Sequence, residues 1–102
     1  MSLPPQPNRL ELVASVAAKE PLGYTPAGVP LVRMRLAYAG TVIEAEIPRQ
    51  LAFEIDAVAL GPTAAAANAL PLGATARFGG FVASKNRRST GLVFHLTGIE
   101  RH

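Results

Sequence analysis

The sequence predicts an all-β chain with one short helix. Apolar and polar residues alternate in several segments of five to ten residues, which is the pattern of strands with one buried face. Clusters of Gly and Pro separate these segments, as turns require. The chain has 102 residues, of which 49% are hydrophobic, so we expect a single domain with a small core.

The first half of the chain predicts an arm and a first strand. Residues 1–7 contain three prolines and are expected to form a flexible N-terminal arm, with the domain itself spanning 8–102. The first strand is expected over Arg9 to Val16, where alternate residues are apolar. Tyr24 to Pro30 follows with two Pro and one Gly at turn spacing, which predicts an ordered loop.

Two further strands are expected to form a short hairpin. Leu31 to Ala39 and Val42 to Ile47 both alternate, and Gly40 between them predicts a tight turn. Arg33 and Arg35 then share a face with Glu44 and Glu46, which predicts cross-strand charge pairs. Two interpretations stay open for this face: surface ion pairs, or a mixed-charge surface on which the two arginines still bind phosphates.

One helix is expected after this hairpin, and a second helical segment after it. Arg49 to Leu60 has apolar residues at roughly helical spacing between Pro48 and the Gly61-Pro62 pair, which predicts a helix. Thr63 to Leu70 is rich in Ala and predicts a further helical segment with Thr63 as its N-cap.

The last third predicts two strands and a bulge. Ala74 to Ala83 and Leu92 to Glu100 are strand-like, and Gly79-Gly80 within the first of them predicts a bulge or sharp bend. Five short strands with a helix between the third and the fourth is the order of an OB-fold, a small barrel that often holds oligonucleotides.

The connection between the last two strands carries a dense positive charge. Lys85-Asn86-Arg87-Arg88-Ser89-Thr90-Gly91 places three cationic side chains within four residues. Such a cluster repels itself unless an anion meets it, and a phosphate chain is a common partner for an Arg-rich loop. A solvated loop that serves only solubility is the alternative.

Composition limits the other possibilities. The net charge of +3 permits a polyanionic partner without requiring one. The chain has no Cys, no apolar run long enough to span a bilayer and no signal-peptide pattern, so we expect an intracellular, cytoplasmic protein. His95 and His102 lack partners at ligand spacing, and no catalytic constellation is visible, which predicts neither metal nor cofactor nor enzymatic activity.

Four stretches carry a resemblance to a known family. They are Asn8-Arg9-Leu10, Thr25-Pro26-Ala27-Gly28-Val29-Pro30, Glu46-Ile47-Pro48 and Gly80-Phe81-Val82 followed by the basic turn. Together they resemble the primosomal replication protein N (PriB) family of bacteria and span nearly the whole chain. The second stretch is shared with the related single-stranded DNA-binding proteins. The end of the chain at Arg101-His102 favours the PriB family, because the related proteins usually carry a long tail.

The resemblance implies a homodimeric OB-fold that binds single-stranded DNA. It also implies contacts with the primosomal helicase, other primosome proteins and single-stranded DNA-binding protein. Family DNA contacts on the turn between strands four and five correspond to Lys85, Arg87 and Arg88. The turn expected at Ala39-Gly40-Thr41 is shorter than the family loop, and Glu44 stands where an aromatic DNA-stacking residue is found.

Aromatic side chains that stack on bases are the other feature expected of a single-strand binder. Tyr24, in the loop before strand two, is the predicted stacking residue, and the other aromatics in strands are expected to fill the core: Tyr38, Phe78, Phe81 and Phe94. The sequence therefore predicts a non-catalytic single-stranded DNA-binding protein. An OB-fold protein–protein adaptor with weak or no DNA binding, or a small hydrolase or nuclease, are the alternatives.

Overall fold

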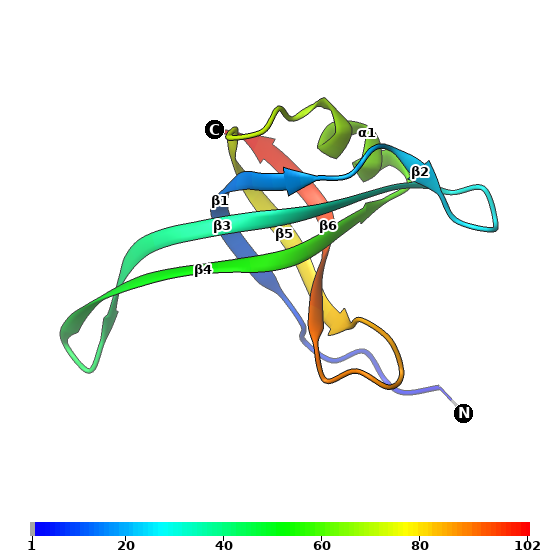
Figure 1. Cartoon of the computed structure of the whole chain (residues 1–102). Coiled ribbons are helices and arrows are strands. Elements are labelled where there is room, and N and C mark those ends of the chain that lie inside the picture. Colours follow the sequence, from blue (N-terminus) through cyan, green and yellow to red (C-terminus); the bar gives the residue numbers. More distant parts are fainter. Residues whose placement is uncertain (1) are drawn as a thin grey trace.

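The computed structural model describes residues 2–102, and the segments with alternating apolar residues form long strands in it. The elements, in chain order, are β1 (Leu10–Lys19), β2 (Gly23–Tyr24), β3 (Pro30–Glu44), β4 (Ile47–Leu60), α1 (Pro62–Ala69), β5 (Thr75–Ser84) and β6 (Leu92–Arg101). Five long strands make a closed barrel, and β2 adds a short piece at its edge (Figure 1). The prediction of an all-β barrel with one helix is confirmed in this coarse form.

The barrel closes at two places. The order of the sheet is β1-β5-β6-β4-β3-β2, and β1 also pairs with β3. The first half of β1 is antiparallel to β5, and its second half, from Ser15 to Lys19, is antiparallel to β3. Opposite this, β4 and β6 run parallel for three residue pairs. The strand β1 is therefore paired along its whole length. Each half has a neighbouring strand on one side only, so its other backbone edge is unpaired within the described chain.

The core is built from the inward positions of the strands. Phe78 and Phe94 are fully buried at its centre, together with Leu36, Val16 and Val32. This confirms Phe78 and Phe94 as core residues, whereas Tyr38, also expected in the core, is only half-buried and lies outside the buried cluster. All the buried hydrophobic side chains of the described residues except Val58 form one cluster, which joins all five long strands to α1.

The expected tight turn at Gly40 is wrong. Gly40 lies within β3 and pairs with Leu51 of β4, so the hairpin continues to a turn at Ala45-Glu46. The ring of Tyr38 occupies the space that a side chain at Gly40 would fill, and it stacks on Phe53. Glycine here makes room for an aromatic ring instead of making a turn.

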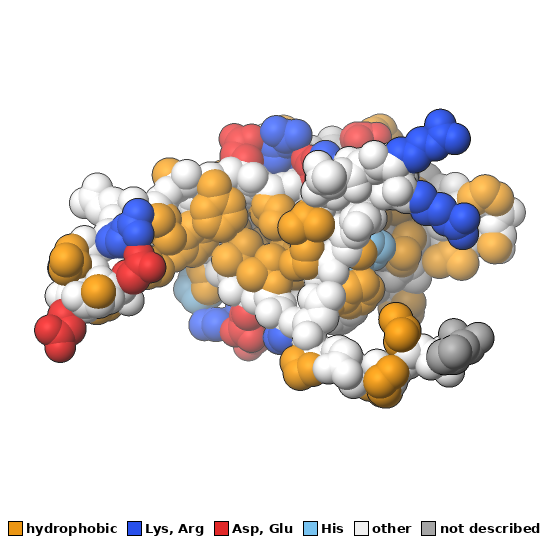
Figure 2. Space-filling model, turned by 90° about the horizontal axis from the view of Figure 1, so that it is seen from below, with side chains coloured by type: hydrophobic (Ala, Val, Ile, Leu, Met, Phe, Trp, Pro, Cys, Tyr) orange, Lys and Arg blue, Asp and Glu red, His pale blue; other side chains and the backbone are white. Residues whose placement is uncertain are grey.

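The longer hairpin changes the expected charge pairs. Arg33 is opposite Val58 and Arg35 is opposite Asp56, so neither arginine faces Glu44 or Glu46. Glu44 instead forms an ion pair with Arg49 near the hairpin end. The hairpin projects well beyond the barrel (Figure 1), and its end exposes hydrophobic side chains beside charged ones, at the left of Figure 2. Ile43 and Ile47, two of these, are 68% and 62% exposed.

The expected helix over Arg49 to Leu60 is also wrong, because this segment is most of β4. Its apolar residues at helical spacing also satisfy the period of two, since Leu51, Phe53, Ile55, Ala57 and Ala59 occupy alternate positions. Pairing with β3 along fourteen residue pairs decides between the two periods. The one helix lies between β4 and β5. Its predicted place between the third and fourth strands is therefore not confirmed, since β2 counts as a strand of its own.

The Ala-rich segment forms the one helix of the described residues. Helix α1 packs Ala64 and Ala67 into the core, and its N-cap is Gly61 instead of the expected Thr63. Lys19 of β1 donates hydrogen bonds to the carbonyl oxygens of Asn68 and Leu70, at 2.8 and 2.6 Å. A lysine at this end is favourable because the last carbonyls of a helix lack partners and carry partial negative charge.

The turn at the hairpin end predicts a stability change. Ala45 and Glu46 have φ angles of 52° and 67°, the left-handed values of a type I′ turn, which non-glycine residues rarely adopt. We expect Glu46→Gly to raise the free energy of unfolding by about 1 kcal/mol, equivalent to a melting temperature about 4–8 °C higher. Thermal unfolding followed by circular dichroism measures this.

The matched control is Ala52→Gly in the same hairpin. Ala52 is an exposed strand residue, so glycine there should lower stability by about 0.5–1 kcal/mol. A loss of stability in both variants would contradict the strained turn.

Candidate nucleic-acid interface

A groove runs between the outer face of the β3–β4 pair and the start of the connection from β5 to β6. It has a volume of about 670 Å³. Its walls come from β3, β4 and β6 and from residues 84–86, and they include Arg33, Arg35, Asp56, Lys85, Asn86 and His95. The groove therefore lies on the face where the sequence predicted DNA binding, and the basic turn overhangs it.

The basic turn is ordered by its own polar residues. Asn86 accepts a hydrogen bond from the backbone N–H of Arg88 at 2.9 Å, and Ser89 accepts one from Gly91 at 2.9 Å. The N–H of Lys85 donates to the carbonyl of Gly91, which closes the base of the loop. Arg87 and Arg88 are exposed at the tip, and within residues 2–102 neither takes part in an ion pair.

Asp56 of β4 holds two of the groove's cations. Its carboxylate forms an ion pair with Lys85 and a second with Arg35 at 2.9 Å, and Arg35 also reaches Glu54 at 3.5 Å. The hydrogen bond from Lys85 lowers the pKa of Asp56 below its usual value, although partial burial of the carboxyl opposes this. Two of the predicted DNA contacts, Lys85 and Arg35, are thus neutralised within the chain itself.

Arg33 differs from Arg35 in this respect. It lines the groove, it is exposed, and the described residues offer it no ion-pair partner. A phosphate in the groove would meet Arg33 without first displacing a carboxylate. The expectation that Glu44 and Glu46 compensate both arginines is therefore wrong, because the compensating acids are Glu54 and Asp56 and they act on Arg35.

Tyr24, the predicted stacking residue, lies at one end of this face. It belongs to β2 and is 65% exposed, and the next residue, Thr25, lines the groove. The loop from Thr25 to Val29 is held by hydrogen bonds from the N–H groups of Gly28 and Val29 to Thr25, which confirms the prediction of an ordered loop. Tyr24 itself does not line the groove.

Two residues on this face were missed by the sequence prediction. His95 lines the groove, and Phe81, expected in the core, is 39% exposed and stacks on His95. Phe78 and Phe81 are three residues apart in β5, and the extra residue of the bulge near Gly79-Gly80 lies in β6, so β5 keeps its alternation and the two rings face opposite sides of the sheet. With Phe78 in the core, Phe81 has to point outward.

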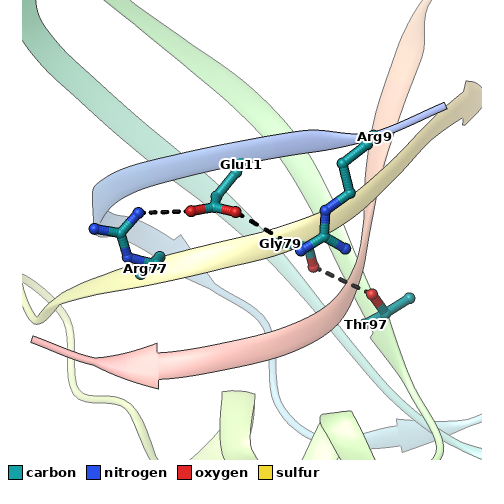
Figure 3. A network of polar contacts seen from close by, with 5 residues as sticks. All are labelled: Arg9, Glu11, Arg77, Gly79 and Thr97. Atoms are coloured by element: carbon teal, nitrogen blue, oxygen red, sulfur yellow. Dashed lines mark hydrogen bonds and ion pairs between the residues drawn. The ribbon is translucent and has the colours of Figure 1, made fainter. Parts of the chain in front are cut away.

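A second, smaller hollow on the β1–β5–β6 side has balanced charge. Glu11 forms ion pairs with Arg77 at 2.6 Å and with Arg9 at 3.8 Å, beside Gly79 (Figure 3). Gly98 also lines this hollow. Glu100 also lines it, so two arginines face two glutamates. This surface has no excess of positive charge for a polyanion.

The described residues contain neither a candidate metal site nor a membrane-spanning helix. In residues 2–102, no three His, Asp or Glu side chains are grouped so that they could hold a metal ion. The only helix described there, α1, is too short to cross a membrane.

The ion pairs of Asp56 predict a pH dependence of stability. Because the pKa of Asp56 is lowered on folding, its contribution is present above the unfolded pKa and is lost as the pH falls through the folded one. We expect Asp56→Asn to lower the free energy of unfolding by up to about 1 kcal/mol at neutral pH. The difference from wild type should shrink as the pH falls below the usual carboxyl range, about pH 4, and should disappear once the pH is below the lowered pKa of Asp56.

Urea unfolding at a series of pH values measures this difference. Glu100→Gln is the control, since Glu100 is exposed and forms no ion pair within the described chain. A gap between wild type and Asp56→Asn that did not narrow at all as the pH fell below about 4 would show that the ion pairs are not its cause.

A closed five-stranded barrel with one helix is the architecture of the OB-fold, a class of small barrels many of which bind oligonucleotides. Comparison with known proteins agrees. A family model described as another single-strand binding protein family matches residues 8–98. The replication restart protein PriB of Bordetella pertussis is 36% identical over 94 residues, which cover 92% of this chain and 88% of that protein. That of Nitrosomonas europaea is 37% identical over 73 residues, with 72% and 68% covered.

Solved structures give the same result. The PriB protein of Ralstonia solanacearum has a TM-score of 0.86 and 40% identity, covering 95% of this chain and 99% of that one. A small single-stranded DNA-binding protein of Streptomyces coelicolor, at 20% identity and a TM-score of 0.70, covers 92% and 93% and shares the fold. The chain therefore belongs to the single-strand binding protein family and, within it, to the replication restart proteins PriB.

Proposed function

We propose that this protein binds single-stranded DNA as a non-catalytic accessory factor of replication restart in the cytoplasm. The observation that carries the proposal is the groove with a cationic loop on one side and Arg33 on its floor. The exposed guanidinium groups of Arg87 and Arg88 offer phosphate contacts beside the groove, whose lining comes from β3, β4 and β6. The names of its relatives support the role in replication restart.

The proposed partners follow from the family. They are the primosomal helicase, other primosome proteins, single-stranded DNA-binding protein and a second copy of the chain in a homodimer. The free edges on either half of β1 are compatible with pairing to another copy. Analytical ultracentrifugation tests the dimer, and a monomer at tens of micromolar would exclude it.

A protein–protein adaptor with weak DNA binding is the second candidate. Two observations favour it: Asp56 and Glu54 neutralise Arg35 and Lys85, and the long β3–β4 hairpin exposes Ile43 and Ile47 at its end. Titration of a fluorescently labelled oligonucleotide at two salt concentrations separates the candidates. Binding at micromolar concentration or tighter with a steep salt dependence supports the DNA-binding function. Absence of binding with retained contact to the helicase supports the adaptor, and cleavage of the oligonucleotide would indicate a nuclease.

The basic turn predicts how affinity depends on salt. Replacing Lys85, Arg87 and Arg88 with Ala should remove two to three phosphate contacts and flatten the log–log salt slope by about 1.4 to 2 units. The fold should survive because all three side chains are exposed. Affinity measured by fluorescence anisotropy at several salt concentrations, with circular dichroism as a check of folding, tests this.

The matched control removes the same charge from another face. Arg9, Arg77 and Arg101 are exposed and do not line the groove, so their replacement with Ala should leave the salt slope nearly unchanged. If the control variant lost as much of the slope as the loop variant, net charge and not the groove would account for binding.

A further inference from the structure

Phe81 and His95 form a stacked aromatic pair on the outside of the barrel. Their ring centroids are 4.9 Å apart, and the ring planes differ by only 6°. Phe81 of β5 is 39% exposed, whereas Phe78 and Phe94 in the same two strands are fully buried. Phe81 also lies outside the buried core cluster and the apolar residues packed against it. The stability of the core therefore does not explain an aromatic residue at this position.

The surrounding residues hold the pair in a fixed geometry. Gly80 lets β5 approach β6 closely, because a side chain at Gly80 would overlap the carbonyl oxygen of His95. On the other side, the amide of Asn8 accepts a hydrogen bond from the N–H of Val82 at 3.0 Å and donates one to its carbonyl at 2.8 Å. Asn8 thus fixes the strand directly after Phe81. The pair is preorganised before any ligand arrives.

The pair is continuous with the groove. Strand pairing places Arg33 beside Val58, Val58 beside His95, and His95 beside Phe81, all on the outer face. His95 belongs to the wall of the groove itself. Since neighbouring strands are about 4.8 Å apart, Phe81 lies about 10 Å from β4. A row of neighbouring side chains therefore connects Arg33, which has no ion-pair partner among the described residues, to the exposed ring of Phe81.

We propose that Phe81, backed by His95, is a stacking subsite for a base of the single-stranded DNA in the groove. His95 covers one face of the Phe81 ring, so the base would use the exposed part of the ring. Bases stack on aromatic side chains without regard to their identity, which suits a binder of single strands. The proposal rests on the proposed function, because it assigns a second contact to the same bound strand.

A tryptophan at this position provides a direct probe. The chain has no Trp, so Phe81→Trp introduces the only one, and stacking of a base quenches its fluorescence. The control is Phe53→Trp. Phe53 is 42% exposed and stacks on Tyr38 at 5.1 Å, much like Phe81 on His95, but it lies on the opposite face of the β3–β4 hairpin from Arg33.

The expected result is strong quenching of the Phe81→Trp variant by an oligothymidylate and little change in the Phe53→Trp variant. In addition, Phe81→Leu, which keeps an apolar side chain without a ring, should bind the oligonucleotide about tenfold more weakly. Its salt slope should stay as in wild type, because no phosphate contact is lost. The corresponding Phe53→Leu variant should bind like wild type.

The outcomes separate this inference from the proposed function. If wild type binds the oligonucleotide but Phe81→Trp is not quenched at saturation and Phe81→Leu binds normally, the stacking subsite is wrong and the DNA-binding function stands. Equal quenching of the two Trp variants would likewise overturn it. If wild type does not bind the oligonucleotide at all, both proposals fail.

Discussion

The short parallel contact between β4 and β6 determines the geometry of the whole site. Three residue pairs, from Ala57 with Phe94 to Ala59 with Leu96, close the barrel. Small side chains at Ala57 and Ala59 leave room for the buried rings of Phe78 and Phe94. The start of the connection that precedes β6 is also tied to β4, by the ion pair between Lys85 and Asp56. Residues 84–86 thereby form one side of the groove.

The charges of the groove are partly balanced by the protein itself. Asp56 forms ion pairs with Lys85 and Arg35. The pair with Lys85 holds the base of the cationic loop against the sheet. This leaves Arg33 and the two arginines at the tip for an incoming phosphate chain. A strand entering the groove must compete with Asp56 for two of five cations, so binding is expected to be weaker than the number of basic residues suggests. Stacking on Phe81 would offset part of that loss.

The sequence predicted the ends of the fold better than its middle. The alternation in β1, β5 and β6, the bulge near Gly79-Gly80 and the basic turn follow directly from local patterns, because each has one strong signal. The prediction for the middle of the chain was wrong where one segment fitted two different patterns. Gly40 is both a turn former and a gap for the ring of Tyr38, and β4 satisfies helical spacing and strand alternation together. Only the pairing partner, which is distant in sequence, decides such cases.

The site was predicted in part for a related reason. The cationic loop with Lys85, Arg87 and Arg88 was predicted from charge density alone, and the structure places Lys85 on the wall of the groove and the two arginines at the exposed tip of the loop; their contact with DNA stays a prediction. The ion pairs of Asp56 could not be found, since they depend on a register that the misplaced turn had shifted. Phe81 was assigned to the core, and strand parity alone could not correct that assignment. A bulge at Gly79-Gly80 would reverse the parity if its extra residue lay in the same strand, and the strand register shows that the extra residue lies in β6.

Amide chemical shifts during an oligonucleotide titration test most directly whether the groove is the binding surface. In ¹H–¹⁵N NMR spectra of the labelled protein, the largest shifts should fall on the groove, at Arg33, Lys85, Asn86 and His95. The hairpin end from Glu44 to Pro48 and the exposed side of α1 should change little. Shifts concentrated on the hairpin end, with the groove unaffected, would contradict DNA binding at the groove.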